Sequence, residues 1–162
     1  MHASSWKFAL AILVLSIAAP LWAQNSSQGN SLMGTWKLDV AKSTFDPGPP
    51  PKSTTVKYEP YGKSGVRVMV DTVDARGILT HAVYTAQYNG KDYPAKGDSA
   101  RDTVALKRID DRTTEVTNKR RGKITTVDTI VVAEDGKTRT VAIKGVNEQG
   151  QAVNNLAFFE KQ

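Results

Sequence analysis

The chain has 162 residues, with 22 basic and 16 acidic side chains and no cysteine. A chain of this size forms one domain that buries roughly two thirds of its unfolded surface, so it needs no disulfides to fold. Its composition excludes a disulfide framework, and its moderate positive charge is typical of a soluble protein rather than of one that binds nucleic acid.

Residues 1–23 have the pattern of a secretory signal. A short basic opening, "MHASSWK", precedes the apolar run "FALAILVLSIAA", and "PLWA" completes a cleavage pattern that ends at Ala23. As a helix the run rises only about 18 Å, whereas a hydrocarbon core of about 30 Å must be crossed by a membrane anchor. We therefore expect a secreted or periplasmic protein after cleavage near Ala23. Residues 24–31 are expected to be a flexible lead-in to a single domain at 32–162.

From residue 32 onward the pattern predicts an all-β domain. Turn segments rich in Gly, Asn and Asp, including "YNGKDYP" (88–94), recur about every twelve residues, and no window has a helical period. The predicted strands are "TWKLDV" (35–40), "TTVKY" (54–58), "VRVMVDTV" (66–73), "ILTHAVYTAQY" (78–88), "TVALKRI" (103–109), "TTEVT" (113–117), "ITTVDTIVV" (124–132), "TVAIKG" (140–145) and "AVNNLAFF" (152–159). A tenth is added if "KGDSA" (96–100) forms a short edge. Such a series is typical of an antiparallel up-and-down meander in a barrel or a sandwich.

The one long connection, residues 41–53, contains three consecutive prolines at 49–51. Proline removes backbone donors and holds the residue before it extended, so no helix is expected there.

One hairpin can be given a register. If Asp135 and Gly136 form a two-residue turn, residue pairs 132/139, 130/141 and 128/143 face each other. One face then collects apolar side chains together with two polar ones. The apolar set is Ile124, Ile130, Val132, Val141 and Ile143, and the polar exceptions are Asp128 and Arg139.

The two ends of the domain resemble those of a known family. "GTWKL" (34–38) is similar to the opening of the fatty-acid-binding branch of the calycins, and "FFEKQ" (158–162) is similar to its close. The resemblance implies a lipocalin-like barrel in which Gly34 and Trp36 belong to the closed end. It also implies an arginine from a late strand over the indole, with Arg139 as first candidate and Arg108 as second. The alternative is an ordinary core tryptophan.

Two departures from that family limit what the resemblance implies. The family inserts two helices after its first strand, where this chain has the proline segment. Its carboxylate-binding arginine and closing tyrosine match Ala157 and Phe159 here. We therefore expect a lidless barrel without the family's fatty-acid chemistry.

Tyrosines and interior charges are the candidates for ligand binding. Tyr84 and Tyr88 share a strand face with two alanines, a small–large alternation that suits a barrel interior, although packing at the rim explains it equally. Asp128 with Arg139 or Arg108 is either an internal ion pair that orients a ligand or a partly hydrated pair of little net value. The candidates are Tyr58, Tyr84, Tyr88, Arg108, Asp128 and Arg139.

No constellation predicts catalysis. His81 is the only histidine after cleavage, and without cysteine it predicts no zinc or copper site and no cofactor. "GDSA" (97–100) resembles the nucleophile block of a serine-esterase class, but the base would have to lie downstream of Ser99, and none does. We interpret the block as a loop and the protein as not an enzyme.

The hairpin tip around "KRRGK" concentrates positive charge. Lys119, Arg120, Arg121 and Lys123 either contact an anionic envelope surface or form a solvated turn.

Two functions remain open for a protein that we expect to be a monomer. One is an exported binding protein for a small apolar or amphipathic ligand. The other is a non-enzymatic envelope interaction or inhibitor protein that uses a filled barrel as a scaffold.

Overall fold

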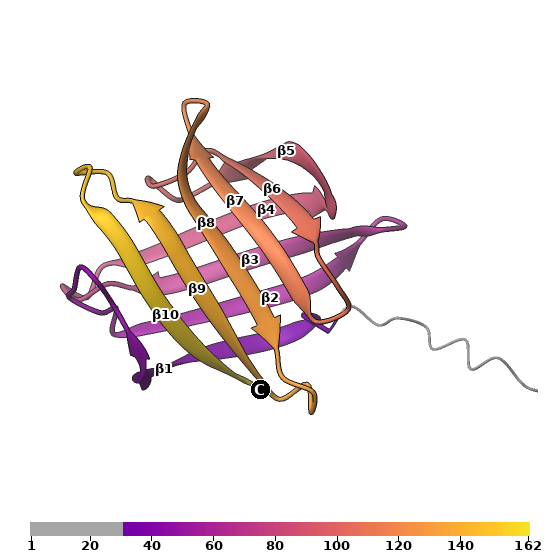
Figure 1. The fold of residues 1–162 in the computed structure, drawn as a ribbon, viewed down its shortest axis with the longest axis horizontal. Coiled ribbons are helices and arrows are strands. Elements are labelled where there is room, and N and C mark those ends of the chain that lie inside the picture. Colours follow the sequence, from indigo (N-terminus) through magenta and orange to yellow (C-terminus); the bar gives the residue numbers. More distant parts are fainter. Residues whose placement is uncertain (1–30) are drawn as a thin grey trace, which may run out of the picture.

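The computed structural model describes residues 31–162, which form a closed antiparallel barrel of ten strands (Figure 1). The predicted signal segment 1–23, and residues 24–30 of the predicted lead-in, lie outside the described residues. The strands are β1 (Gly34–Thr44), β2 (Ser53–Tyr61), β3 (Gly65–Val73), β4 (Leu79–Gln87), β5 (Asn89–Lys96), β6 (Thr103–Arg108), β7 (Thr113–Arg120), β8 (Lys123–Val132), β9 (Thr138–Val146) and β10 (Ala152–Lys161). Each strand pairs with the next, and β10 pairs with β1. The predicted all-β, up-and-down barrel is confirmed.

Alternation along the strands produces the core. In β3, Val66 and Val68 are fully buried while Arg67 between them is exposed, because successive side chains point to opposite faces of the sheet. Closure leaves no free strand edge that another chain could extend. No helix within residues 31–162 is long and apolar enough to cross a membrane.

The tenth strand comes from a different segment than predicted. Residues 88–94 were expected to be a turn, but only Tyr88 lies between β4 and β5, and Gly90, whose φ is +72°, already belongs to β5. The chain then continues as β5, in which Tyr93 lies opposite Val104 of β6. The predicted edge strand at 96–100 is wrong, because residues 97–100 form a loop.

The register of the β8–β9 hairpin is confirmed. Asp128 lies opposite Ile143, and Val132 lies opposite Arg139. The prediction for Ile124 is wrong, since this side chain is 57% exposed. The pairing of β7 with β8 shifts by one residue between Asn118 and Lys119, and this bulge turns the β8 side chains before it to the other face.

Trp36 lies at one end of the barrel and is fully buried. Its indole N–H donates a 2.7 Å hydrogen bond to the carbonyl of Leu32, so the residues before β1 satisfy its polar atom. The Arg139 guanidinium lies 4.9 Å from the ring centroid, and the Lys161 ammonium lies 5.2 Å from it. Gly34 has a φ of +110°, and a Cβ there would meet the Lys161 side chain at 3.0 Å, which accounts for a glycine two residues before the tryptophan.

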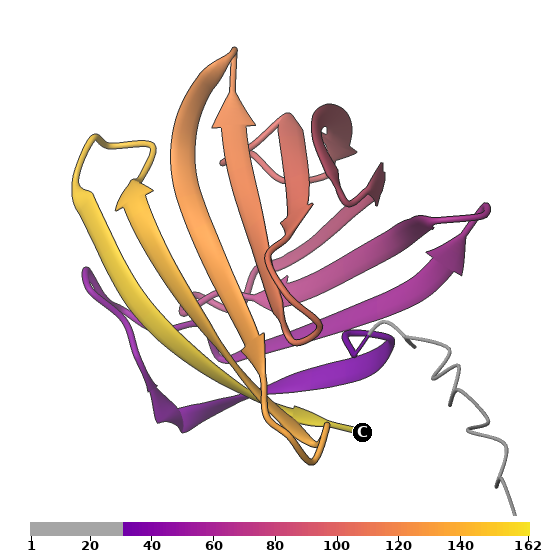
Figure 2. The same ribbon diagram turned by 45° about the vertical axis from the view of Figure 1, so that its right-hand side comes forward.

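The other end of the barrel is formed by the β7–β8 and β9–β10 hairpins and the β5–β6 loop. Figure 2 shows the two hairpins at the upper end, opposite the C terminus. The β1–β2 connection contains no helix, as predicted. It contacts β10 through Asp46, whose backbone N–H donates a 2.8 Å hydrogen bond to the Asn155 side chain.

Candidate functional site

The barrel interior contains a partly open cavity of about 160 Å³, which we call the inner chamber. A cavity of about 150 Å³ is enough to hold benzene, so the inner chamber has room for about one ring or a short chain. Its apolar lining is Val56, Val70, Val116, Ile130, Val141, Ile143 and Phe159, and its polar lining is Thr54, Tyr58, Tyr84, Arg101, Asp128 and Arg139. Apolar walls with a few convergent polar groups are characteristic of small-molecule sites.

A second, wider space of about 370 Å³ lies at the hairpin end, and we call it the outer vestibule. It is lined by the β5–β6 loop, the ends of β7 and β8, and the β9–β10 hairpin. Arg101, Asp128 and Ile143 line both spaces. Anything that passes from the vestibule into the inner chamber therefore meets one cation and one carboxylate.

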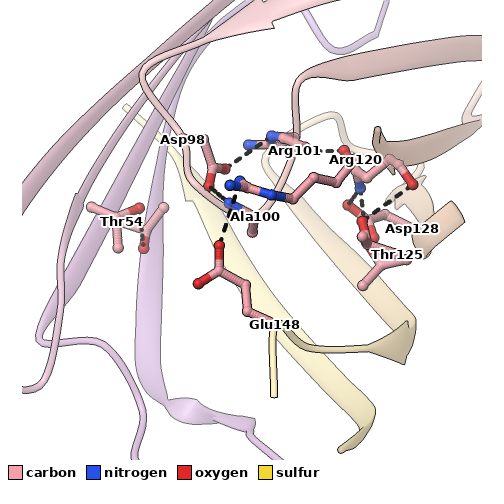
Figure 3. Close-up of polar contacts among 11 residues, drawn as sticks. Thr54, Asp98, Ala100, Arg101, Arg120, Thr125, Asp128 and Glu148 are labelled. Atoms are coloured by element: carbon pink, nitrogen blue, oxygen red, sulfur yellow. Dashed lines mark hydrogen bonds and ion pairs between the residues drawn. The ribbon is translucent and has the colours of Figure 1, made fainter. Parts of the chain in front are cut away.

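A hydrogen-bonded network separates the two spaces, and we call Asp98, Arg101, Asn118, Thr126 and Asp128 the partition. Arg101 Nε lies 3.0 Å from Asp98 Oδ2, and Arg101 Nη1 donates a 2.8 Å hydrogen bond to Asn118 Oδ1. The Asn118 amide in turn donates to Asp128 Oδ2 at 2.8 Å and to Thr126 Oγ1 at 2.9 Å. Figure 3 shows Arg101 beside Asp98, with the Arg120–Glu148 ion pair next to them.

Asp128 is incompletely satisfied in this network. Its Oδ2 accepts from Asn118, but its Oδ1 is buried and has no hydrogen-bond partner. Burial raises the pKa of Asp128, and the positive charge of Arg101 and the hydrogen bonds from Thr126 and Asn118 only partly oppose that rise. A buried carboxylate oxygen without a donor costs free energy, and a ligand with a donor would remove that cost.

Arg139 also has buried polar atoms without hydrogen-bond partners, as do Asp128 and, at Nε, Arg101, and only 2% of Arg139 is exposed. Its guanidinium lies 4.6 Å from the Phe159 ring centroid, 4.9 Å from that of Trp36 and 5.0 Å from that of Tyr58. The rings stabilise the cation through their negative faces, but Nε and Nη1 are buried without hydrogen-bond partners. Arg139 therefore presents donors at the edge of the inner chamber.

Comparison with solved structures shows what fold these groups belong to. The fluorescent protein UnaG matches with a TM-score of 0.55 at 12% identity, over 82% of this chain and 98% of that one. A single-site mutant of UnaG matches with a TM-score of 0.56, also at 12% identity, over 82% and 96% of the two chains. The fold is calycin-like, of the fatty-acid-binding type. No family model matches the chain, and no curated protein matches it in sequence.

The interior of this calycin-like barrel differs from the predicted arrangement in its ion pairing. Asp128 and Arg139 lie on adjacent strands but four residues apart in register, and no ion pair joins Asp128 to Arg139 or Arg108 in the described part of the chain. The cation near Asp128 is Arg101, which reaches it through Asn118. The arginine nearest to Asp128 is therefore Arg101, from the β5–β6 loop, and not the predicted strand residue Arg139 or Arg108.

The predicted ligand-binding residues fall into two groups. Tyr58, Tyr84, Asp128 and Arg139 all line the inner chamber. Tyr88 and Arg108 do not line it, and instead the Arg108 guanidinium lies 4.7 Å from the Tyr88 ring centroid. Burial raises the pKa of Tyr84, so its phenol stays protonated and able to donate a hydrogen bond.

Of the five partition residues, sequence reasoning identified only Asp128, and the two that link it to a cation, Asn118 and Arg101, were missed. Asn118 lies on the same face of β7 as Val116, and extending the predicted strand by one residue would have placed this amide in the interior. Arg101 lies in a loop, where no periodicity indicates the direction of a side chain.

The remaining candidates lie away from the inner chamber. His81 is exposed on β4, and its Nδ1 lies 2.6 Å from Asp71 Oδ1, whereas Ser99 lines the outer vestibule. At the basic tip, Lys119 pairs with Asp92 at 2.8 Å and Arg120 pairs with Glu148 at 3.5 Å. Arg121 and Lys123 are both exposed. Among residues 31–162, no group of three or more His, Asp or Glu side chains is placed to hold a metal.

Replacing Asp128 with asparagine is expected to stabilise the unliganded protein at pH 7 by about 1–3 kcal/mol. Because its pKa is raised in the folded state, the folded protein holds this proton more tightly than the unfolded chain does. Ionisation of Asp128 therefore lowers stability as the pH rises from its ordinary pKa of 3.8 through the raised pKa, and the penalty is complete above that.

Urea unfolding of both proteins at pH 7 and at about pH 3 measures this linkage. The gain should vanish at the lower pH, where Asp128 is protonated in both states. Asp135→Asn, the same change in the exposed β8–β9 turn, is the control and should have little effect. An Asp128→Asn gain of equal size at both pH values would contradict the explanation.

Proposed function

We propose that the protein is an exported binding protein for a small amphipathic molecule that it holds in the inner chamber. The observation that carries the proposal is a mostly apolar chamber in the barrel interior beside which two guanidinium nitrogens of Arg139 have no partner. Apolar walls favour a hydrocarbon body, and unsatisfied donors favour an acidic or carbonyl group on the same molecule. The calycin-like fold supports a carrier role because its strands surround an interior space.

The size of the chamber restricts the ligand. About 160 Å³ is below the range of about 300–1,000 Å³ that is usual for drug-sized ligands. A longer molecule would have to pass Arg101 and Asp128 into the outer vestibule. The alternative function, an envelope interaction or inhibitor protein, assumed a barrel filled with side chains. The inner chamber and the outer vestibule do not fit that assumption.

Export is part of the proposal and is supported by the signal pattern of residues 1–23. A contact of the basic tip with an anionic envelope surface rests on Arg121 and Lys123, because Lys119 and Arg120 already have carboxylate partners.

Binding of 3-phenylpropionate and of 3-phenylpropanol, measured by calorimetry and native mass spectrometry, tests the proposal. The acid should bind, and Arg139→Met should weaken it by about 10–100-fold, since hydrogen bonds to a charged group contribute about 1.5–3 kcal/mol. Methionine keeps an apolar stem among the three rings, so the alcohol should bind both proteins similarly.

Arg112→Met is the matched control, because Arg112 is half exposed and pairs with Glu134 outside the barrel. It should leave both affinities unchanged. The intact mass also shows whether exported protein begins at Gln24. If neither the acid nor the alcohol binds at millimolar concentration, the binding function is wrong.

A further inference from the structure

The charges inside the barrel are unbalanced in two separate places. Asp98 and Arg101 neutralise each other through their 3.0 Å ion pair, which leaves Asp128 with a neutral amide as its near partner. Arg139 has three aromatic rings around it, and no described carboxylate pairs with it. The inner chamber thus has an uncompensated carboxylate at its boundary with the vestibule and an uncompensated guanidinium on the side of Trp36.

We propose that the ligand of the inner chamber is a compact zwitterion, with its anionic group at Arg139 and a protonated amine at Asp128. This inference rests on the proposed binding function and adds to it the second charged group and the orientation of the ligand. The atoms assigned to the ligand are Nε and Nη1 of Arg139 and Oδ1 of Asp128, which are buried and without partners.

The register of β8 and β9 sets the spacing of the two anchors. Ile143 lies opposite Asp128 and Val132 lies opposite Arg139, so the two charged residues are four positions apart on one interior face. Four residues of strand span about 13 Å, and both side chains line the space between them. The gap that remains suits charged groups on opposite sides of one ring or of a short chain.

An ammonium group fits Asp128 better than a neutral donor does. A hydroxyl would supply the missing hydrogen bond but would leave the buried negative charge uncompensated. A ligand with an acid group alone would satisfy Arg139 and leave Asp128 as it is. A protonated amine supplies both the donor and the opposite charge, and a charge-assisted hydrogen bond is roughly twice as strong as a neutral one.

Three aromatic probes of nearly equal shape test the inference at pH 7.5. The zwitterion is 4-(aminomethyl)benzoate, 4-methylbenzoate lacks the amine, and 4-methylbenzylamine lacks the acid. Calorimetry should show that the zwitterion binds at least tenfold more tightly than either relative. Asp128→Asn should abolish its advantage over 4-methylbenzoate and leave the affinity for 4-methylbenzoate unchanged or higher.

Asp135→Asn removes the same charge from the exposed turn of the β8–β9 hairpin and should keep the full preference for the zwitterion. A second readout needs no variant: in protein labelled with ¹³C at aspartate carboxyl groups, the zwitterion should shift the Asp128 resonance and 4-methylbenzoate should not.

Failure of the inference is distinct from failure of the binding function. If 4-methylbenzoate binds but the zwitterion gains nothing, or if Asp128→Asn keeps the preference, the zwitterion assignment is overturned and the acid-binding chamber stands. If none of the three probes binds and 3-phenylpropionate does not bind either, both proposals are overturned.

Discussion

Trp36→Ala is expected to lower the free energy of unfolding by about 3–5 kcal/mol. The indole is fully buried, and its removal would open a cavity around Arg139 and leave the Leu32 carbonyl without its 2.7 Å donor. Arg139 would also lose one of the three rings that surround its guanidinium. The measurement is urea or thermal unfolding, in which a loss of this size lowers the midpoint by about 10–15 °C.

Two further variants separate the contributions. Trp36→Phe keeps a ring under Arg139 but loses the hydrogen bond, so its loss should be clearly smaller than that of the alanine variant. Tyr61→Ala removes a ring that is 56% exposed and should change stability by less than about 1 kcal/mol. Equal losses for Trp36→Ala and Tyr61→Ala would show that the indole does not close the barrel.

Gly97→Ala is expected to destabilise the protein by about 2–5 kcal/mol. Gly97 has a φ of +82°, and an added Cβ would collide with the backbone carbonyl of His81 on β4. Neither atom belongs to a flexible side chain, so the start of the β5–β6 loop would have to move. That loop carries Asp98 and Arg101, and the substitution should therefore disturb the partition as well as stability.

Gly136→Ala separates the conformational cost from the collision. Gly136 has a φ of +67°, but no atom lies within 4 Å of an added Cβ. Its loss should be only about 1–2 kcal/mol, the cost of a left-handed conformation for alanine. Equal losses at the two glycines in denaturant unfolding would contradict the collision with His81.

Much of this fold could be predicted from local patterns. Alternation and turn chemistry identified nine of the ten strands as segments, and the turn at Asp135–Gly136 fixed a register that the structure confirms. That register alone places Asp128 and Arg139 on the interior face, because a strand with a known turn has only two faces.

The misses have a common physical origin in irregular backbone. The bulge between Asn118 and Lys119 reverses which β8 side chains face the interior, and it exposes Ile124. No residue type at the bulge predicts it. The partner of Asp128 depended on the direction of a loop side chain, Arg101, and on a tertiary contact through Asn118. Periodicity carries no information about either.

The packing of Trp36 also has a spectroscopic consequence. The sequence has three tryptophans, and two of them, Trp6 and Trp22, belong to the segment that export would remove. The mature protein would then contain a single indole, 4.9 Å from the guanidinium that faces the inner chamber. Its fluorescence would come from one environment. Binding of an anionic group at Arg139 would therefore alter that fluorescence without any added label.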